Sequence, residues 1–153
     1  MPRRELHEPA QVIAWLEDWS ERLREDGVMI LIGSAALLWH VHRAGLTTAL
    51  PENSMDVDPV TDSDAVAELA YDAMIGSEFE LEHGWHVNLM PRSVLREMPS
   101  DWEARAAEAC YGRLRVVVPC VADLLAPKLK RGEPRDLAHA RFMGGLGLYQ
   151  RPT

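Results

Sequence analysis

Two aspartates, Asp56 and Asp58, carry the clearest chemical signal in the sequence. They lie in residues 54–60, a stretch that predicts a β-strand. Strand side chains alternate between two faces, so the carboxylates share one face, roughly 6.5–7 Å apart, while Met55 and Val57 take the other. Like charges this close repel each other unless a cation lies between them, and Mg²⁺ prefers oxygen ligands such as these. Alone, an Asp-x-Asp motif is weak because most such pairs are solvated loop residues, so its meaning depends on the rest of the chain.

A glycine–serine pair, Gly33-Ser34, follows an unbroken apolar run at 28–32 and precedes a helical pattern that ends near Gly45. The run predicts a strand that is covered on both faces. A strand, turn and helix in this order present free backbone N–H groups and the positive end of a helix dipole to an anion. Gly33 would let a phosphate approach the backbone, and the Ser34 hydroxyl would bind it. Taken alone, the pair is better explained as an ordinary tight turn in which Ser34 caps the helix.

Two charged residues, Lys128 and Asp136, fall on the apolar sides of the last two predicted helices, residues 120–131 and 133–143. Lys128 follows two leucines by three and four positions, so its ammonium group shares the packed stripe and needs a partner or a route to solvent. Asp136 aligns with the apolar residues of its own helix. Its simplest interpretation is a first-turn acid that the helix dipole favours.

The elements that would position these residues follow from hydrophobic periodicity and turn signals. We predict a helix at 9–25, a strand at 28–32, a loop at 44–53, a helix at 65–75, two strands at 77–81 and 85–90, a partly helical segment at 99–112 and a strand at 114–118. Asp62 and Asp64 would cap the third helix, and His83-Gly84 would form the turn of a hairpin.

Neither of two histidine pairs predicts a metal site. His40 and His42 are two positions apart on a predicted helix, so they point to different sides. His83 and His86 flank a predicted turn with no cysteine nearby, which is a poor fit to a zinc site. The tryptophans of the first helix are best explained as core residues.

Composition and charge predict a single globular domain spanning residues 1–153, with 47% hydrophobic and 26% charged residues. The formal net charge of −8 argues against a broad DNA-binding surface but leaves room for a local basic cleft. No apolar run reaches membrane-spanning length and the first residues lack the apolar region of a signal peptide, so we expect a cytoplasmic protein without membrane contact. Cys110 and Cys120 predict buried reduced thiols.

The order of these features resembles the signature of the DNA polymerase β-like nucleotidyltransferase superfamily. Gly33-Ser34, a helix and then Asp56-Val57-Asp58 on a strand form its first part. The segment 118–129, a short basic link and Arg135-Asp136-Leu137 form its second part. The likeness is closer to small prokaryotic members, the minimal and AbiEii-type nucleotidyltransferases of toxin–antitoxin systems, and spans about residues 28–141.

The resemblance implies an α+β nucleotidyltransferase fold with a mixed sheet of about five strands flanked by helices. It also implies transfer of a nucleoside monophosphate from an NTP to an RNA or protein acceptor, with Mg²⁺ as cofactor, pyrophosphate as product and an antitoxin as a possible partner. The implied roles are Mg²⁺ binding for Asp56 and Asp58, triphosphate binding for Gly33 and Ser34, neutralisation of phosphate charge for Lys128, and orientation of that lysine or completion of the cleft for Asp136.

The chain departs from the superfamily pattern in two places. The superfamily often has a third carboxylate on a later strand, and the matching strand at 85–90 offers Asn88 instead. An amide oxygen can coordinate Mg²⁺, so Asn88 joins the expected ligands, but it cannot act as a base. His86, on the same strand face, is the candidate for that role. The interval before the first aspartate is also longer than in the family, which implies a loop insertion around residues 47–53.

Three hypotheses follow. The first is a Mg²⁺-dependent nucleotidyltransferase, including the toxin of a toxin–antitoxin system. The second, motivated by Asn88, is a catalytically impaired module of the same fold that binds a nucleotide or a partner protein. The third is a small α+β domain whose acids are all surface residues, and it predicts no nucleotide binding at all.

Overall fold

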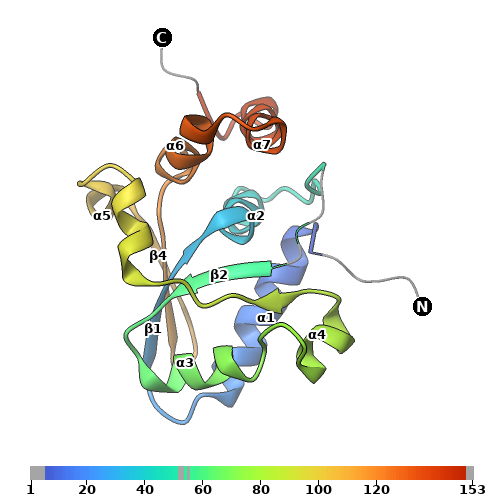
Figure 1. Cartoon of the computed structure of the whole chain (residues 1–153), viewed down its shortest axis with the longest axis vertical. Helices are drawn as coiled ribbons and strands as arrows, with labels where there is room; N and C mark the ends of the chain where they lie inside the picture. The colour runs from blue at the N-terminus through green and yellow to red at the C-terminus, as the bar shows by residue number, and fades with distance from the viewer. Residues whose placement is uncertain (1–5, 52–53, 55, 151–153) are drawn as a thin grey trace.

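The computed structural model describes residues 6–51, 54 and 56–150. Its centre is a mixed sheet of five strands in the order β3-β2-β1-β5-β4, flanked by helices (Figure 1). The strands are β1 (Gly27–Ile32), β2 (Asp56–Val60), β3 (His86–Val87), β4 (Ala107–Tyr111) and β5 (Leu114–Val118). The helices are α1 (Pro9–Arg22), α2 (Gly33–Arg43), α3 (Asp64–Tyr71), α4 (Glu78–His83), the 3₁₀ helix η1 (Arg92–Glu97), α5 (Trp102–Arg105), α6 (Val121–Arg131) and α7 (Pro134–Gly145).

Strand β1 lies at the middle of the sheet, where it pairs antiparallel with β2 and parallel with β5. Beyond these neighbours, β3 runs parallel to β2 and β4 runs antiparallel to β5. The sheet therefore mixes both pairing modes. This arrangement confirms the predicted α+β class and the predicted mixed sheet of about five strands flanked by helices.

The apolar run of β1 is continuous because both faces of the sheet are covered. Met29 and Leu31 are fully buried in the main core, which α1 and α2 share. Ile30 and Ile32 point to the other face and pack against a second cluster. That cluster is formed by residues of β2, η1 and the segment around α5, namely Val60, Leu95, Met98 and Trp102. The prediction of a strand covered on both faces therefore holds for residues 29–32 but not for Val28, which is 40% exposed.

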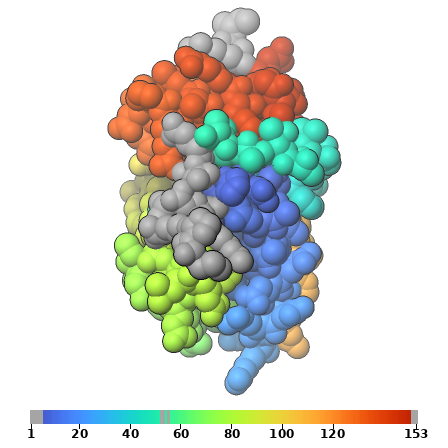
Figure 2. Space-filling view, turned by 90° about the vertical axis from the view of Figure 1, so that its right-hand side faces the viewer, coloured from blue at the N-terminus to red at the C-terminus, as the bar shows by residue number. Residues whose placement is uncertain are grey.

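The two C-terminal helices, α6 and α7, pack on each other and through α6 on α2. Figure 2 shows them at one end of the molecule, above α2 and the loop that follows it. Leu125 of α6 and Met143 of α7 are fully buried, so the predicted packed sides of both helices face inward. Helix α2 thus contacts both the sheet and the C-terminal helices.

The prediction of a strand at 77–81 is wrong, because this segment forms helix α4. Ser77 caps the helix through its side-chain oxygen, which accepts a hydrogen bond from the Glu80 N–H at 3.2 Å. Two acids in the first turn favour the helix through its dipole. Gly84, which suggested a hairpin turn, is instead the left-handed residue at the end of the helix, with φ of 81°. Strand β3 is correspondingly short and pairs with β2.

The partly helical segment predicted at 99–112 divides into a short helix and a strand. Only Trp102–Arg105 is helical, and Ala107–Tyr111 forms β4, so the predicted helical positions Ala109 and Cys110 lie in a strand. Gly112, with φ of 55°, makes the turn to β5. Pairing with β5 outweighs the helix propensity of the alanines, because strand preference depends on the neighbouring strand.

Some predicted boundaries and caps also change. Helix α1 ends at Arg22, and Gly27, which was predicted to stop it, begins β1. Helix α2 begins at Gly33 with Ile32 as its N-cap, so the alternative in which Ser34 caps the helix is wrong. These shifts arise because strand pairing, which the local sequence does not encode, decides where the elements meet.

Several smaller predictions are also settled. Asp62 forms an exposed ion pair with Arg92 at 3.0 Å and does not cap α3. Cys110 is exposed and Cys120 is half-buried, so the prediction of buried thiols is wrong for Cys110. Met55 and residues 52–53 of the predicted insertion lie outside the described residues. Within the described ranges, no helix is long and apolar enough to cross a membrane.

Candidate functional site

A cleft of about 420 Å³ opens where the β1–α2 corner, β2, η1 and the C-terminal helices meet. Its lining includes the predicted phosphate-binding pair, the paired acids and the two inward charges: Gly33, Ser34, Asp56, Asp58, Lys128 and Asp136. Asn88 does not line the cleft but contacts Asp58. The lining residues come from α2, β2, α6 and α7, which are far apart in the sequence. The tertiary structure therefore brings the predicted residues together.

The paired acids lie on one face of β2, as predicted. Asp56 and Asp58 are partly exposed, and Val57 between them is fully buried. Asp58 pairs with Ile32 across the antiparallel β1–β2 ladder, which brings it against Gly33. Gly33 has φ of +76°, and a Cβ on it would lie 2.5 Å from Asp58 Oδ2. The corner therefore requires glycine, both for its backbone conformation and for the close approach of the carboxylate.

Burial and the neighbouring charge of Asp56 disfavour the ionised form of Asp58 when no cation is bound. Burial, and then the charge of Asp56, raise the pKa of Asp58 from 3.8 to about 7. The Asn88 amide and the charges of Lys128 and Arg135 oppose this shift but do not cancel it. The strand thus holds two acids where a second negative charge is costly, and a bound cation would relieve that cost.

The N-terminal end of α2 faces the same cleft. Ser34 is 7% exposed, and its hydroxyl has no hydrogen-bond partner in the part of the chain that the structure describes. The first backbone N–H groups of a helix also lack partners within the helix and carry its positive partial charge. The Gly33-Ser34 corner therefore offers donors suited to a phosphate oxygen.

Lys128 reaches the cleft from α6 and is held there by its neighbours. Its side chain is 11% exposed, and its Nζ lies 4.0 Å from Asp136 Oδ1. Burial lowers the pKa of Lys128, while the negative charges of Asp136 and Asp58 oppose that change. Asp136 accepts two hydrogen bonds from Arg131, at 2.8 Å and 3.2 Å, which hold its own pKa low. The predicted inward positions of Lys128 and Asp136 are confirmed.

The sequence matches a family model described as a nucleotidyltransferase of unknown function, DUF6036, over residues 5–141. The chain belongs to this nucleotidyltransferase family. The match confirms the nucleotidyltransferase part of the resemblance. The family description names neither an AbiEii-type subgroup nor a toxin, so those remain predictions. No curated protein and no solved structure gives a significant match to the chain.

In this family member, Asn88 stands beside the paired acids, as its strand position predicts. Its backbone N–H donates to the Val57 carbonyl, and its amide nitrogen lies 3.4 Å from Asp58 Oδ1 and 3.4 Å from Met90 Sδ. The amide thus presents a donor to Asp58. Coordination of Mg²⁺ by the Asn88 oxygen, which we predicted, would require the amide to turn over.

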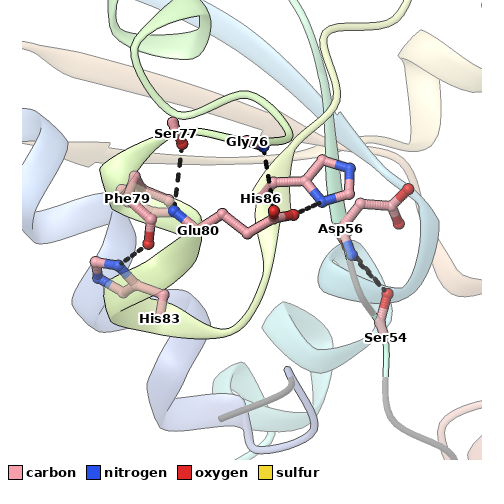
Figure 3. Close-up of polar contacts among 8 residues, drawn as sticks. All are labelled: Ser54, Asp56, Gly76, Ser77, Phe79, Glu80, His83 and His86. Carbon is pink, nitrogen blue, oxygen red and sulfur yellow. Dashed lines mark hydrogen bonds and ion pairs between the residues drawn. The ribbon is translucent and has the colours of Figure 1, made fainter. Parts of the chain in front are cut away.

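His86 lies next to Asp56 and forms a pair with Glu80 (Figure 3). His86 was identified from the sequence, but Glu80 was not. The Nδ1 atom of His86 lies 2.8 Å from Glu80 Oε2, and both side chains are largely buried, with 16% and 15% exposed. The contact has the distance of an ion pair, but the ring N–H is not aligned on the oxygen as a hydrogen bond requires. Glu80 was missed because its segment was predicted as a strand, whereas the helix turns its side chain toward His86.

Sequence reasoning also missed part of the cleft wall. Arg131 and Arg135 line the cleft with Lys128. The family resemblance included Arg131 only within the basic link, and it named Arg135 as part of Arg135-Asp136-Leu137 without giving it a role. Their spacing could have identified them: Arg131 follows Lys128 by one helical turn, and Arg135 lies in the first turn of the next helix. The lining also includes the apolar residues Met90, Val94 and Met98.

A buried histidine lies near these charges. His139 of α7 is fully buried, and neither ring nitrogen has a hydrogen-bond partner in the described ranges. Burial, and then the charge of Lys128, lower its pKa to about 4. The imidazole is therefore neutral near pH 7 and adds no positive charge beside Lys128 and Arg135.

The donor set fits Mg²⁺ bound together with a nucleotide. The Asp56 carboxylate has no ion-pair or hydrogen-bond partner among the described residues. The charged form of Asp58 is disfavoured by burial and by the charge of Asp56. The described residues contain no cluster of three or more histidine, cysteine or acidic side chains that could enclose a metal. Mg²⁺ commonly takes one or two carboxylates and completes its shell with water and substrate phosphates. Two aspartates beside a phosphate-binding corner match that pattern.

Proposed function

We propose that the protein is a Mg²⁺-dependent nucleotidyltransferase that moves a nucleoside monophosphate from an NTP to a hydroxyl group of an RNA or protein acceptor. The observation that carries this proposal is that Asp56, Asp58, Gly33-Ser34 and Lys128 line one cleft. Membership of a nucleotidyltransferase family supports the reaction class.

In this proposal the chain binds the triphosphate from two sides. The backbone N–H groups at the start of α2 and the Ser34 hydroxyl donate to phosphate oxygens. Lys128, Arg131 and Arg135 approach from the C-terminal helices and neutralise phosphate charge, since all three line the cleft. Fixed donors of this kind stabilise charge that develops in the transition state without reorganising.

Asp56 and Asp58 would hold the metal. When bound, Mg²⁺ would neutralise phosphate charge and stabilise the attacking and leaving oxygens. Asp136 acts on a different group, because it keeps Arg131 and Lys128 oriented toward the cleft through the contacts described above. Asp136 is therefore a positioning residue in this scheme.

The test is transfer of label from α-³²P-NTPs to macromolecules of a bacterial lysate, with the purified protein and Mg²⁺. We expect labelling by the wild type and a loss of roughly 10²-fold or more in an Asp56→Asn/Asp58→Asn double variant, because both carboxylates are removed with little change in volume. A matched control is Asp72→Asn, an exposed aspartate at the end of α3. Equal labelling by wild type and double variant would rule out this site.

A second candidate function is favoured by Asn88. A module that binds an NTP or a partner protein without transfer would keep the cleft and lack a third carboxylate, as this chain does at Asn88. Calorimetry distinguishes the two functions. Binding of Mg²⁺–NTP without labelling of any acceptor would favour the binding module.

We also propose that the protein acts in the cytoplasm, where its NTP substrate is found, as the toxin of a toxin–antitoxin pair. The support is the resemblance of Gly33-Ser34, Asp56/Asp58 and the segment 118–137 to small prokaryotic nucleotidyltransferases. Expression of the chain should arrest growth, and co-expression of the neighbouring reading frame should relieve the arrest. Growth arrest that persists in the Asp56→Asn/Asp58→Asn variant would contradict a toxin that acts through this cleft.

A further inference from the structure

Transfer to a hydroxyl group requires a group that accepts the hydroxyl proton, and the acids of the cleft are already engaged. Asp56 and Asp58 are the candidate metal ligands, and Asp136 is bound to Arg131. Asn88 donates to Asp58 and has no basic atom. A residue next to the paired acids is therefore the better candidate for the base.

Two other acids, Glu97 and Glu133, line the cleft together with Arg131. The hydrogen bonds to Asp136 raise the pKa of Arg131, and the negative charges of Glu133 and Glu97 add to this effect. They belong to η1 and to the start of α7, and neither is on the strands that carry the paired acids. Their position suits neutralisation of Arg131.

His86 occupies the strand position next to the first aspartate. In the parallel β2–β3 pair, His86 is in register with Asp56 and Val87 with Val57. Because the buried valines point to the core side, His86 and Asp56 share the opposite face of the sheet. Figure 3 shows the His86 ring between the Glu80 carboxylate and the Asp56 side chain.

The Glu80 carboxylate lies against the Nδ1 edge of the ring. Its Oε2 lies 2.8 Å from His86 Nδ1, and its Oε1 accepts a hydrogen bond from the Gly76 N–H at 3.1 Å. The start of α4 is fixed in turn by the Ser77 cap. A carboxylate beside Nδ1 favours the tautomer with the proton on that atom, which leaves the lone pair on Nε2. The Nε2 edge of the ring faces the Asp56 side (Figure 3).

We propose that His86 is the general base of the transfer reaction and that Glu80 positions it. This inference rests on the proposed function. Nε2 takes the proton of the acceptor hydroxyl as its oxygen forms a bond to the α-phosphorus of the NTP. The bond from the α-phosphorus to the oxygen that bridges to the β-phosphate breaks, and pyrophosphate leaves with that electron pair. His86 then releases the proton to solvent.

The test combines His86→Ala with label transfer, nucleotide binding and chemical rescue. We expect transfer from α-³²P-NTPs to lysate macromolecules to fall roughly 10²-fold or more, as for loss of a general base. Binding of Mg²⁺–NTP, measured by calorimetry, should stay within about two-fold of wild type, because binding does not need the base. Added imidazole should restore part of the transfer, which a merely structural role would not allow.

Two further variants refine the result. Glu80→Gln should lower transfer by roughly 10-fold, since it weakens the orientation of the ring and keeps the base. His42→Ala, an exposed histidine on α2, is the matched control and should transfer as the wild type does.

The outcomes separate the two proposals. Wild-type transfer by His86→Ala, with loss of transfer in Asp56→Asn/Asp58→Asn, would overturn the role of His86 and leave the proposed function intact. Loss of transfer in His86→Ala without imidazole rescue, or with loss of Mg²⁺–NTP binding, would also overturn it. No transfer by the wild type under any condition would contradict the proposed function itself.

Discussion

Gly33 and Asp58 lie against each other in the candidate site. The glycine is at the corner where β1 becomes α2, and the aspartate lies beside it on the neighbouring strand. The free space at Gly33 is filled by the Asp58 carboxylate, and its φ of +76° is one that side chains rarely adopt. The glycine and the paired acids are therefore one structural unit, although more than twenty residues separate them in the sequence.

Gly33→Ala is expected to lower both stability and ligand affinity. The positive φ alone costs about 1–2 kcal/mol, and the added methyl group collides with Asp58. Mg²⁺–NTP binding should weaken roughly 10–100-fold, because a candidate metal ligand is displaced. Urea unfolding and calorimetry measure the two effects. Gly45→Ala is the matched control, since Gly45 has φ of +78° and open space around its Cβ position. Equal losses of affinity in both variants would contradict this explanation.

The raised pKa of Asp58 predicts how the stability of the metal-free protein depends on pH. Between pH 3.8 and about 7 the native state keeps a proton that the unfolded chain has lost, so the free energy of unfolding falls as pH rises through this range. Asp58→Asn removes the effect. We expect it to stabilise the metal-free protein at pH 8 by roughly 2–4 kcal/mol, and by much less near pH 4. Urea unfolding with a chelator at both pH values tests this.

Asp72→Asn, which replaces an exposed aspartate, is the control for the Asp58 measurement. It should leave the pH dependence of the wild type unchanged. A stability difference between Asp58→Asn and wild type that is the same at pH 4 and pH 8 would show that burial and the Asp56 charge do not act on Asp58 in this way.

At the scale of elements, one carboxylate joins the two C-terminal helices. Asp136 in the first turn of α7 accepts two hydrogen bonds from Arg131 near the end of α6, and Lys128 lies one turn earlier on α6. Asp136 is 3% exposed, so its charge depends on these partners. The contact fixes the angle between the helices and keeps two cations at the cleft.

Asp136→Ala is expected to destabilise the protein by about 3–5 kcal/mol, because it leaves Lys128 buried without its nearest acid. Hydrogen exchange should show faster exchange of α7 amides than in the wild type, since the link to α6 is lost. Lys130→Ala, which removes an exposed charge from α6, should have a small effect. An unchanged free energy of unfolding in Asp136→Ala would contradict the linking role.

At the scale of the whole molecule, the cleft lies between two groups of elements. The sheet, α2 and η1 form one side, and α6 and α7 form the other. A ligand bound there contacts both groups only in the folded state, so it should stabilise the whole fold.

Mg²⁺–NTP should therefore raise the melting temperature of the wild type in proportion to the logarithm of its concentration. At about 100 times the dissociation constant the expected stabilisation is about 2.7 kcal/mol. Differential scanning calorimetry measures the shift. The Asp56→Asn/Asp58→Asn variant should show little shift at the same concentration, and NTP without Mg²⁺ should have a weaker effect on the wild type. A shift of the same size in all three samples would point to binding elsewhere.

Much of the fold follows from local patterns. Strong hydrophobic periodicity and clear turn signals at their ends predicted three strands and four helices: β1, β2, β5, α1, α2, α6 and α7. The segment of α4 was assigned to a strand because it is short and Gly84 suits either a hairpin turn or a helix end. Strand β4 was missed because its identity depends on its neighbour β5.

The sequence by itself determined the chemical types at the site: paired acids on one strand face, a glycine–serine corner and an inward lysine. These depend on side-chain alternation and helical periodicity, which act over a few residues. Only the tertiary structure decided that they line one cleft, that Asp58 packs against Gly33, and that Glu80 lies next to His86. Such contacts join residues distant in the chain, and strand pairing and helix packing, which local patterns do not specify, bring them together.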